Sequence, residues 1–278
     1  MSRTSAVLLL CGTLALAAVG VGWWLYRPTY RLHQAEQALA GSDLARAAAL
    51  LQSLTADARA RTLYERVLRR LVKADTSANR WDDVDRVYSR WLDFEPDRLD
   101  IRLARGQNRL TMARETGGST APAVDDFRSI LNRDPDNYEA RLSLAQTLLS
   151  DAHMAEAQKE LLVCRRLRPG RAEPLIGLAS CAIEDRNWTE AHDLLRQALE
   201  RDPGSATALT MKGDVCLQQQ QYAQAAEYFR EALKWEPLNK NAHLKLAQAL
   251  RYGGRDDEAR REERAYEKLD HAEKQASP

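Results

Sequence analysis

Apolar and small residues recur along this chain in blocks that share one repeat length. The fragments FEP, RDP, LRP, RDP and WEP place prolines at 96, 135, 169, 203 and 237, with steps of 39, 34, 34 and 34 residues. A fixed period of about 20–50 residues indicates a repeat architecture. Aromatic residues make up only 6% of the chain and glycines number 13 of 278, which disfavours a turn-rich all-β fold. The pattern therefore predicts an all-α chain.

Within each block, small and large side chains alternate at helical spacing. We count positions from the residue 31 before each proline, and count the first helix of the longest block from Leu99. Small residues at position 8 or 20 and a large residue at position 24 would let helices approach closely. A bulky residue at position 17 follows a polar break, so each block is predicted to be a helical hairpin. The residues are Gly106, Ala145, Ala179 and Gly213 at position 8; Trp81, Met154, Trp188 and Tyr222 at position 17; Ala123, Ala157, Ala191 and Ala225 at position 20; and Phe127, Leu161, Leu195 and Phe229 at position 24.

These residues resemble the tetratricopeptide repeat family, whose pattern is W-x2-L-G-x2-Y, then A-x3-F, then P. The resemblance covers roughly residues 28–273 and implies a right-handed superhelical solenoid of about seven hairpins. An insertion at residues 115–121 is expected to lengthen one hairpin loop, and a polar helix is expected to cap the stack. The predicted units lie near 28–61, 62–98, 99–137, 138–171, 172–205, 206–239 and 240–273, followed by a tail at 274–278.

The amino-terminal segment differs from the repeats. After a short flank, residues 1–3, residues 4–26 carry no charge, and they are long enough for a helix to cross a hydrocarbon core of about 30 Å. Trp23 and Trp24 lie at its carboxyl end, as expected at a membrane interface. We expect a single transmembrane anchor. A secretory signal cleaved after residues 15–17 is the alternative. Basic residues flank both ends, so the side of the membrane that holds the body stays open.

Charge and motifs favour a protein without catalysis. The chain has 41 basic and 40 acidic residues, which gives no excess that would select nucleic acid. The four cysteines form no CxxC pair, and no histidines have metal-ligand spacing. Phosphate-binding and nucleophile motifs are missing as well. We therefore predict no enzyme, metal or cofactor. The acid pairs are expected at the starts of second helices, where they complement the helix dipole: Asp82–Asp83, Asp125–Asp126 and Asp256–Asp257.

One basic cluster lies on a single predicted helix. Glu65 and Asp75 are interleaved with it and no aromatic platform accompanies it, which favours a solvated face. A docking patch for acidic protein or lipid is the alternative, and nucleic acid is not expected to bind. The cluster consists of Arg66, Arg69, Arg70 and Lys73, with Arg59 and Arg61 just before them.

The family resemblance also implies a binding surface. In that family, positions 2, 5, 9 and 12 of the first helices face a concave groove. Here positions 5 and 12 are mostly apolar and position 9 is mostly neutral and polar, which suits an apolar or amphipathic protein segment. The alternative is that positions 5 and 12 simply pack within the solenoid. The predicted groove residues are Leu103, Gln107, Leu110, Leu142, Gln146, Leu149, Ile176, Ser180, Ile183 and Leu217.

Together these features predict a membrane-anchored scaffold or adaptor. Its groove would bind a protein or peptide segment and gather a complex at the bilayer, which residues 4–26 would enter. One alternative is a secreted or periplasmic repeat protein, formed by signal cleavage. Another is an accessory subunit of an envelope-biogenesis enzyme.

Overall fold

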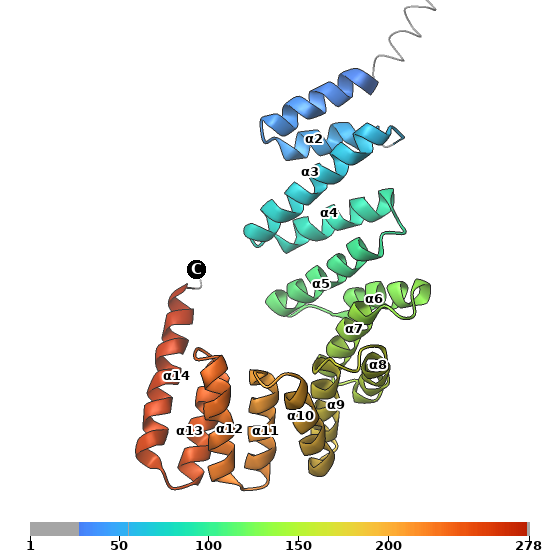
Figure 1. Cartoon of the computed structure of the whole chain (residues 1–278). Helices are drawn as coiled ribbons and strands as arrows, with labels where there is room; N and C mark the ends of the chain where they lie inside the picture. Colours follow the sequence, from blue (N-terminus) through green and yellow to red (C-terminus); the bar gives the residue numbers. More distant parts are fainter. Residues whose placement is uncertain (1–27, 55, 277–278) are drawn as a thin grey trace, which may run out of the picture. The chain divides into compact units, whose positions relative to one another are not determined.

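The computed structural model describes residues 28–54 and 56–276, which form helices joined by short turns (Figure 1). This confirms the predicted all-α class. The described part divides into two compact units, the first ending at Asp126 and the second beginning at Phe127. The helices are a first stretch at residues 28–40, then α2 (Leu44–Leu51), α3 (Ala58–Ser77), α4 (Trp81–Phe94), α5 (Leu99–Thr116), α6 (Ala121–Arg133), α7 (Tyr138–Ser150), α8 (Met154–Leu167), α9 (Glu173–Glu184), α10 (Trp188–Arg201), α11 (Ala206–Gln218), α12 (Tyr222–Trp235), α13 (Lys240–Tyr252) and α14 (Asp256–Ala276).

The predicted membrane anchor, residues 4–26, lies outside the described residues. Among residues 28–54 and 56–276, no helix combines the length and the hydropathy needed to cross a bilayer.

The hairpin turns repeat with the predicted period. Trp81, Met154, Trp188 and Tyr222, the bulky residues of position 17, are the first residues of α4, α8, α10 and α12. Each turn also contains one residue with positive φ. Four of these follow one another at 34-residue intervals: Ala152, Arg186, Gln220 and Gly254.

The predicted contact between small and large residues is present in the second unit. Gly213 of α11 lies against Phe229 of α12, and a Cβ added at Gly213 would come within 2.5 Å of that ring. Leu161 of α8 fills the space beside Gly177 of α9 in the same way. Both large side chains are fully buried. The helices therefore interlock through small residues, as the sequence indicates.

In the first compact unit, which ends at Asp126, one helix boundary differs from the boundaries of the predicted repeats. The helix α3 begins at Ala58, which lies inside the predicted unit 28–61. The reason is a capping residue, because the Asp57 carboxylate accepts hydrogen bonds from the backbone N–H groups of Arg59 and Ala60. The buried cluster of this unit includes Leu51, Tyr64 and Trp91.

The insertion at residues 115–121 lengthens the hairpin loop by one residue: residues 117–120 join α5 to α6, where three residues join α7 to α8. Of the predicted insertion only Glu115 and Thr116 are in α5, which has 18 residues where α7, α11 and α13 have 13. The helix ends at Thr116 because Gly117 adopts a φ of 67°, and its N–H donates to the carbonyl of Ala113. The extra turns lengthen the first helix of one hairpin.

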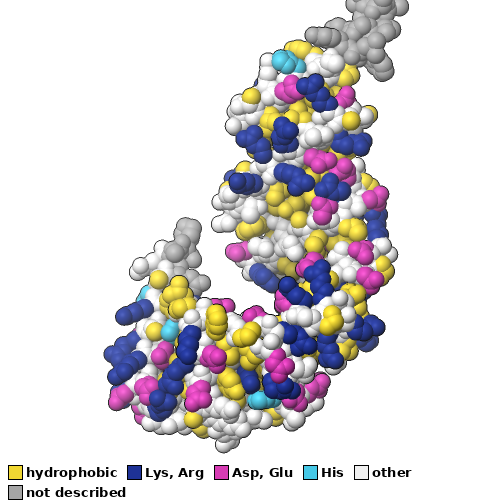
Figure 2. Space-filling view, viewed as in Figure 1, with side chains coloured by type: hydrophobic (Ala, Val, Ile, Leu, Met, Phe, Trp, Pro, Cys, Tyr) yellow, Lys and Arg dark blue, Asp and Glu magenta, His cyan; other side chains and the backbone are white. Residues whose placement is uncertain are grey.

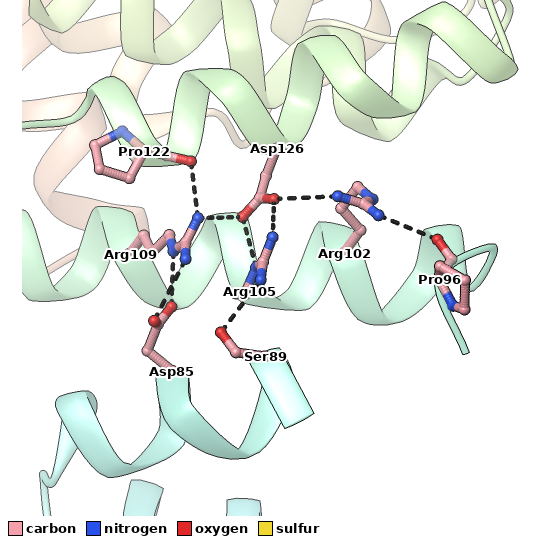
Figure 3. A network of polar contacts seen from close by, with 8 residues as sticks. All are labelled: Asp85, Ser89, Pro96, Arg102, Arg105, Arg109, Pro122 and Asp126. Carbon is pink, nitrogen blue, oxygen red and sulfur yellow. Dashed lines mark hydrogen bonds and ion pairs between the residues drawn. The ribbon is translucent and has the colours of Figure 1, made fainter. Parts of the chain in front are cut away.

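A buried ionic network joins α4, α5 and the first part of α6 (Figure 3). Asp126 is only 2% exposed. Its carboxylate accepts hydrogen bonds from Arg105 at 2.6 and 3.0 Å and from Arg109 at 3.0 Å, and Arg102 lies 3.8 Å away. Arg109 also donates to Asp85 at 2.7 Å. Further acceptors hold the three guanidinium groups: Ser89 for Arg105, and the carbonyls of Pro96 and Pro122 for Arg102 and Arg109.

This network corrects one prediction about the acid pairs. Asp82 and Asp256 do lie in the first turns of α4 and α14. Asp126 does not, because α6 begins at Ala121 and has no acidic residue in its first turn. Its charge is stabilised by three arginines rather than by a helix dipole.

Two repeat positions, 4 and 23, connect the helices of each hairpin from residue 65 onward, and their chemistry is of two kinds. In three hairpins a basic side chain at position 4 contacts a carboxylate at position 23, and the same side chain hydrogen-bonds the carbonyl of the proline six residues earlier. In the other three the pair is apolar, and its members lie in one core cluster. The ionic pairs are Arg102–Asp126, Arg141–Glu160 and His243–Glu262; the apolar pairs are Leu68 with Val87, Leu175 with Leu194, and Leu209 with Tyr228.

Candidate functional site

Most predicted groove residues lie on a row of first helices. In the second unit, α7, α9, α11 and α13 contact one another in sequence. Leu142, Gln146 and Leu149 come from α7, Ile176, Ser180 and Ile183 from α9, and Leu217 from α11. Leu103, Gln107 and Leu110 lie on α5 of the first unit.

The apolar members of this row are only partly exposed. Leu142 is 8% exposed and belongs to the core cluster of the second unit. Leu149, Ile176 and Ile183 are half-buried and pack against the same cluster. Gln146 is exposed. The apolar side chains of this row are therefore anchored in the core and only partly exposed at the surface. Leu142 contributes almost no exposed area to that surface.

A cavity of about 600 Å³ opens beside this row in the second unit. It brings together two predicted residues, Gln146 and Ile176, with residues that the sequence analysis did not select. Most of them come from the turns that precede α9 and α11 and from the beginnings of those helices, and Leu161 and Arg201 come from α8 and the end of α10. The lining residues are Gln146, Leu161, Gly170, Arg171, Ala172, Glu173, Ile176, Gly177, Arg201, Asp202, Ser205 and Thr207.

The cavity has apolar side chains from two layers of helices. Leu161 is fully buried and fits against Gly177, and Ile176 is half-buried beside them. A side chain at position 177 would collide with Leu161, since a Cβ there would lie 2.7 Å from it. The glycine therefore lets α8 approach α9 and sets the depth of the cavity.

Charged and polar groups surround this apolar part. Arg171 forms an ion pair with Glu173. The hydrogen bond to the Glu173 carboxylate and its negative charge raise the pKa of the arginine. Arg201 donates to the carbonyls of Pro169 at 2.7 Å and Gln197 at 2.8 Å, but pairs with no carboxylate among the residues described. Ser205 caps α11 by accepting from the N–H of Ala208. The local turns thus hold the charged residues in place.

Two neutral groups at the cavity have unused hydrogen-bonding capacity. The amide of Gln146 and the hydroxyl of Thr207 form no hydrogen bond with any residue in the described ranges. An amide can donate and accept at once, which matches the backbone of a peptide. The cavity can therefore pair with backbone groups and enclose an apolar side chain.

Further along the row, an ion pair joins α11 to α13. Lys245 donates to Asp214, and both side chains are partly buried. Burial raises the pKa of the Asp214 carboxyl, and the hydrogen bond and charge of Lys245 only partly offset this effect. Leu244 on the same helix is 46% exposed. This end of the row has a fixed charge pair next to an exposed apolar side chain.

Sequence reasoning missed most of the cavity lining for an identifiable reason. Glu173 and Thr207 occupy position 2, which faces the groove in the family, but positions 5, 9 and 12 were the ones compared across blocks. Arg171 and Ser205 lie in the turns just after the repeated prolines. Comparing position 2 and these turns across blocks would have selected them.

Comparisons with known proteins agree with this architecture. Two tetratricopeptide repeat family models match residues 176–234 and 216–265. No curated protein matches the chain.

Solved structures with the same fold show low sequence identity to this chain. A tetratricopeptide repeat protein from Parabacteroides merdae has a TM-score of 0.64 at 13% identity, over 87% of this chain and 93% of that chain. A thermophilic tetratricopeptide repeat protein from Thermus thermophilus has a TM-score of 0.54 at 16% identity, over 67% of this chain and 98% of that chain. The structure of MamA from Desulfovibrio magneticus, which begins at residue 41 of that protein, has a TM-score of 0.53 at 16% identity. The match covers 63% of this chain and 96% of that chain.

Proposed function

We propose that this chain is a scaffold whose second unit binds a segment of another protein, because residues 176–265 match models of the tetratricopeptide repeat family. The observation that carries the proposal is the cavity of about 600 Å³ beside Gln146 and Ile176. Its volume lies within the range of about 300–1,000 Å³ typical of ligand pockets. The bound segment would place an apolar side chain against Leu161 and Ile176.

The polar groups define the rest of the segment. Gln146 and Thr207 would pair with its backbone, and Arg201 would favour a carboxylate or carbonyl oxygen at the cavity edge. The half-buried Leu149 and Ile183 would extend the apolar contact along the row. This supports an amphipathic segment.

We also propose that the protein acts without catalysis. Acid–base catalysis would need an available acid pair, and residues 125–126 are one of the three Asp–Asp pairs in the sequence. Asp126 already accepts hydrogen bonds from Arg105 and Arg109 and is nearly inaccessible to solvent, which favours a structural role. Turnover by the purified protein that disappeared in Asp125→Asn would contradict this proposal.

The membrane anchor is part of the same proposal. It rests on the uncharged run at residues 4–26, which is followed at once by the helical repeats. Intact-mass measurement of the native protein separates retention from cleavage, because a mass that begins near Ala18 would show that the segment is removed. Protease protection in sealed vesicles would then report the side of the membrane.

Binding can be tested with peptides that are selected from a displayed random peptide library by their affinity for the full chain. Thr207→Trp should fill the cavity, and Gln158→Trp places the same side chain on α8, away from the cavity lining. Both positions are exposed, so we expect unchanged melting. Affinity measured by fluorescence anisotropy should fall about tenfold or more with Thr207→Trp only. Equal affinity for both variants would show that the cavity is not the binding site.

A further inference from the structure

The charge of the chain is unevenly distributed. Residues 28–80 carry nine Lys or Arg against five Asp or Glu, whereas residues 81–278 carry 30 against 35. The first two helices and α3 are therefore basic in a protein that is otherwise slightly acidic. The source of this excess is the cluster on α3.

Four basic side chains form a stripe on one face of α3. Arg66, Arg69, Arg70 and Lys73 are spaced by three, one and three residues, which places them side by side on a helix. All four are exposed. Over the seven residues that separate the ends, the stripe is about 10 Å long. We call these four residues the α3 stripe, and Figure 2 shows Lys and Arg side chains gathered over this part of the first unit.

The acidic neighbours in sequence do not neutralise the stripe. Glu65 turns toward Arg98, with 3.9 Å between the two charged groups. Asp75 is 8% exposed and accepts two hydrogen bonds from Arg80. Of the interleaved acids that favoured a merely solvated face, Asp75 lies on the opposite face of α3, and Glu65, one turn before Arg69 at the edge of the stripe, is already paired with Arg98.

Two acids of nearby helices are engaged as well. Glu36 pairs with Arg59, and Asp100 pairs with Arg98. Across the described ranges, none of the four stripe residues has a carboxylate partner. Like charges side by side on a helix cost stability, so an exposed and unneutralised stripe of this length calls for an external partner.

Arg69 lies over an aromatic ring, which favours one orientation of its side chain. Its guanidinium lies over the Trp91 ring, 5.2 Å from the ring centre, and it makes no hydrogen bond within the described structure. Arg98 lies over the same ring at 5.8 Å, but its donors are taken by Glu95 and Asp100. Stacking orients a guanidinium and leaves its N–H groups available, which reduces the entropy lost on binding a carboxylate.

The stripe occupies repeat positions 2, 5, 6 and 9 of its hairpin. In the second unit, positions 2, 5 and 9 supply Thr207, Ile176 and Gln146 to the cavity. The stripe therefore lies on the helix face that in the other unit is hollowed for a ligand. Its chemistry differs, since cations replace the apolar and amide groups.

We propose that the α3 stripe binds an acidic segment of a partner protein, with Arg69 pairing in a bidentate manner with one carboxylate. Three of the four cations are arginines, whose planar donors match carboxylates better than lysine does. Single-stranded nucleic acid would need exposed rings for stacking, and Trp91 is 1% exposed. A lipid surface is attracted by net charge and does not require the orientation that Trp91 gives Arg69. This surface is independent of the cavity in the second unit.

The test uses the full chain and a fluorescent alanine-based peptide whose four glutamates repeat the spacing of the stripe. A glutamine version of the peptide is the neutral control. The stripe variant is Arg69→Gln with Arg70→Gln and Lys73→Gln. The matched variant is Lys159→Gln with Arg165→Gln and Arg166→Gln, which removes the same charge from exposed positions on α8 that also lack carboxylate partners in the described structure.

We expect the stripe variant to lose peptide affinity by about tenfold or more, and the matched variant by about twofold or less. Arg69→Lys keeps the charge but loses the planar donors, so it should lie between them, at about three- to fivefold. Melting followed by circular dichroism should be unchanged in all variants, because the replaced side chains are exposed.

Three results would overturn the proposal. Equal losses in the stripe and matched variants would mean that only net charge matters. Absence of binding to the glutamate peptide at low salt would mean that the stripe has no affinity for acidic protein. Tighter binding to phosphatidylserine-containing vesicles or to oligo(dT) than to the peptide, lost in the stripe variant, would assign the surface to lipid or nucleic acid instead.

Discussion

The hairpin of α5 with α6 and the hairpin of α9 with α10 place opposite chemistry at the same repeat positions. Positions 4 and 23 are Arg102 and Asp126 in one and Leu175 and Leu194 in the other. Asp126 and the two leucines are buried, and Arg102 is mostly so. The comparison shows that the repeat requires complementary side chains at these positions rather than apolar ones.

The two solutions carry different energetic risks. Burying a charge is costly unless several partners compensate, and Asp126 has Arg102, Arg105 and Arg109 around it. For Arg109, burial acts to lower the pKa of the guanidinium, and the hydrogen bonds and charges of Asp85 and Asp126 outweigh it and raise that pKa. An apolar pair needs no such compensation but depends on close packing.

The largest effect should come from breaking the ionic hairpin at its centre. Asp126→Ala leaves three arginines facing one another in a buried site, so the free energy of unfolding should fall by about 3–5 kcal/mol. Urea denaturation followed by circular dichroism measures this. Asp125→Ala is the control, because Asp125 is exposed and adjacent. Equal effects of the two substitutions would show that the network contributes no specific stability.

Breaking the apolar hairpin should have a comparable or slightly smaller effect. Leu175 is fully buried, so Leu175→Ala should reduce the unfolding free energy by about 2–5 kcal/mol through lost burial and a residual cavity. Leu162→Ala on α8 is the control, since Leu162 is 45% exposed and should cost far less. If the losses were the same, packing at position 4 would not be what holds this hairpin.

Much of the fold could be predicted because it depends on local spacing. The repeated prolines and the bulky position-17 residues located the helix starts of α8, α10 and α12 correctly. The start of α3 was missed because Asp57, its cap, lies outside any repeated position. The role of Asp126 was missed because its arginine partners are 17 to 24 residues away, and local reasoning considered only its own helix.

The candidate site was less predictable than the fold. Position 5 holds an apolar residue in both α7 and α9, yet Leu142 is buried and Ile176 lines the cavity. Sequence spacing gives the face of a helix, but not how far the neighbouring hairpin covers it. The cavity also depends on turn residues such as Arg171, whose position follows from the packing of two successive hairpins.

A smaller effect is expected when an ionic hairpin is converted into an apolar one. His243 contacts Glu262 at 2.7 Å, and both side chains are partly buried. The double variant His243→Leu with Glu262→Leu should unfold within about 1.5 kcal/mol of the parent, because an apolar pair can replace a buried ionic one. A double-mutant cycle in urea checks this. Non-additivity below about 0.5 kcal/mol would show that the two residues do not act as a pair.

The smallest difference between the two kinds of hairpin should be in the rate at which their buried cysteine thiols become accessible through local opening. Cys164 lies in the hairpin closed by Arg141 and Glu160, and Cys181 lies in the one closed by Leu175 and Leu194. Burial raises the pKa of the Cys164 thiol to about 11, with smaller opposing effects of Arg141 and Glu160, and it also raises the pKa of Cys181. Reactive thiolate should therefore be scarce at both sites.

At pH 8 only about one Cys164 thiol in a thousand would be ionised even if reagent reached it, and the fraction grows as the pH rises toward 11. Labelling with iodoacetamide, read by peptide mass spectrometry in a Cys11→Ser background, should be slow at both cysteines and differ by less than about threefold between them. Both should react fully in urea. Rapid labelling of Cys164 alone would mean that the ionic pair lets its hairpin open where the apolar pair does not, so that complementary chemistry at positions 4 and 23 would not give equal rigidity.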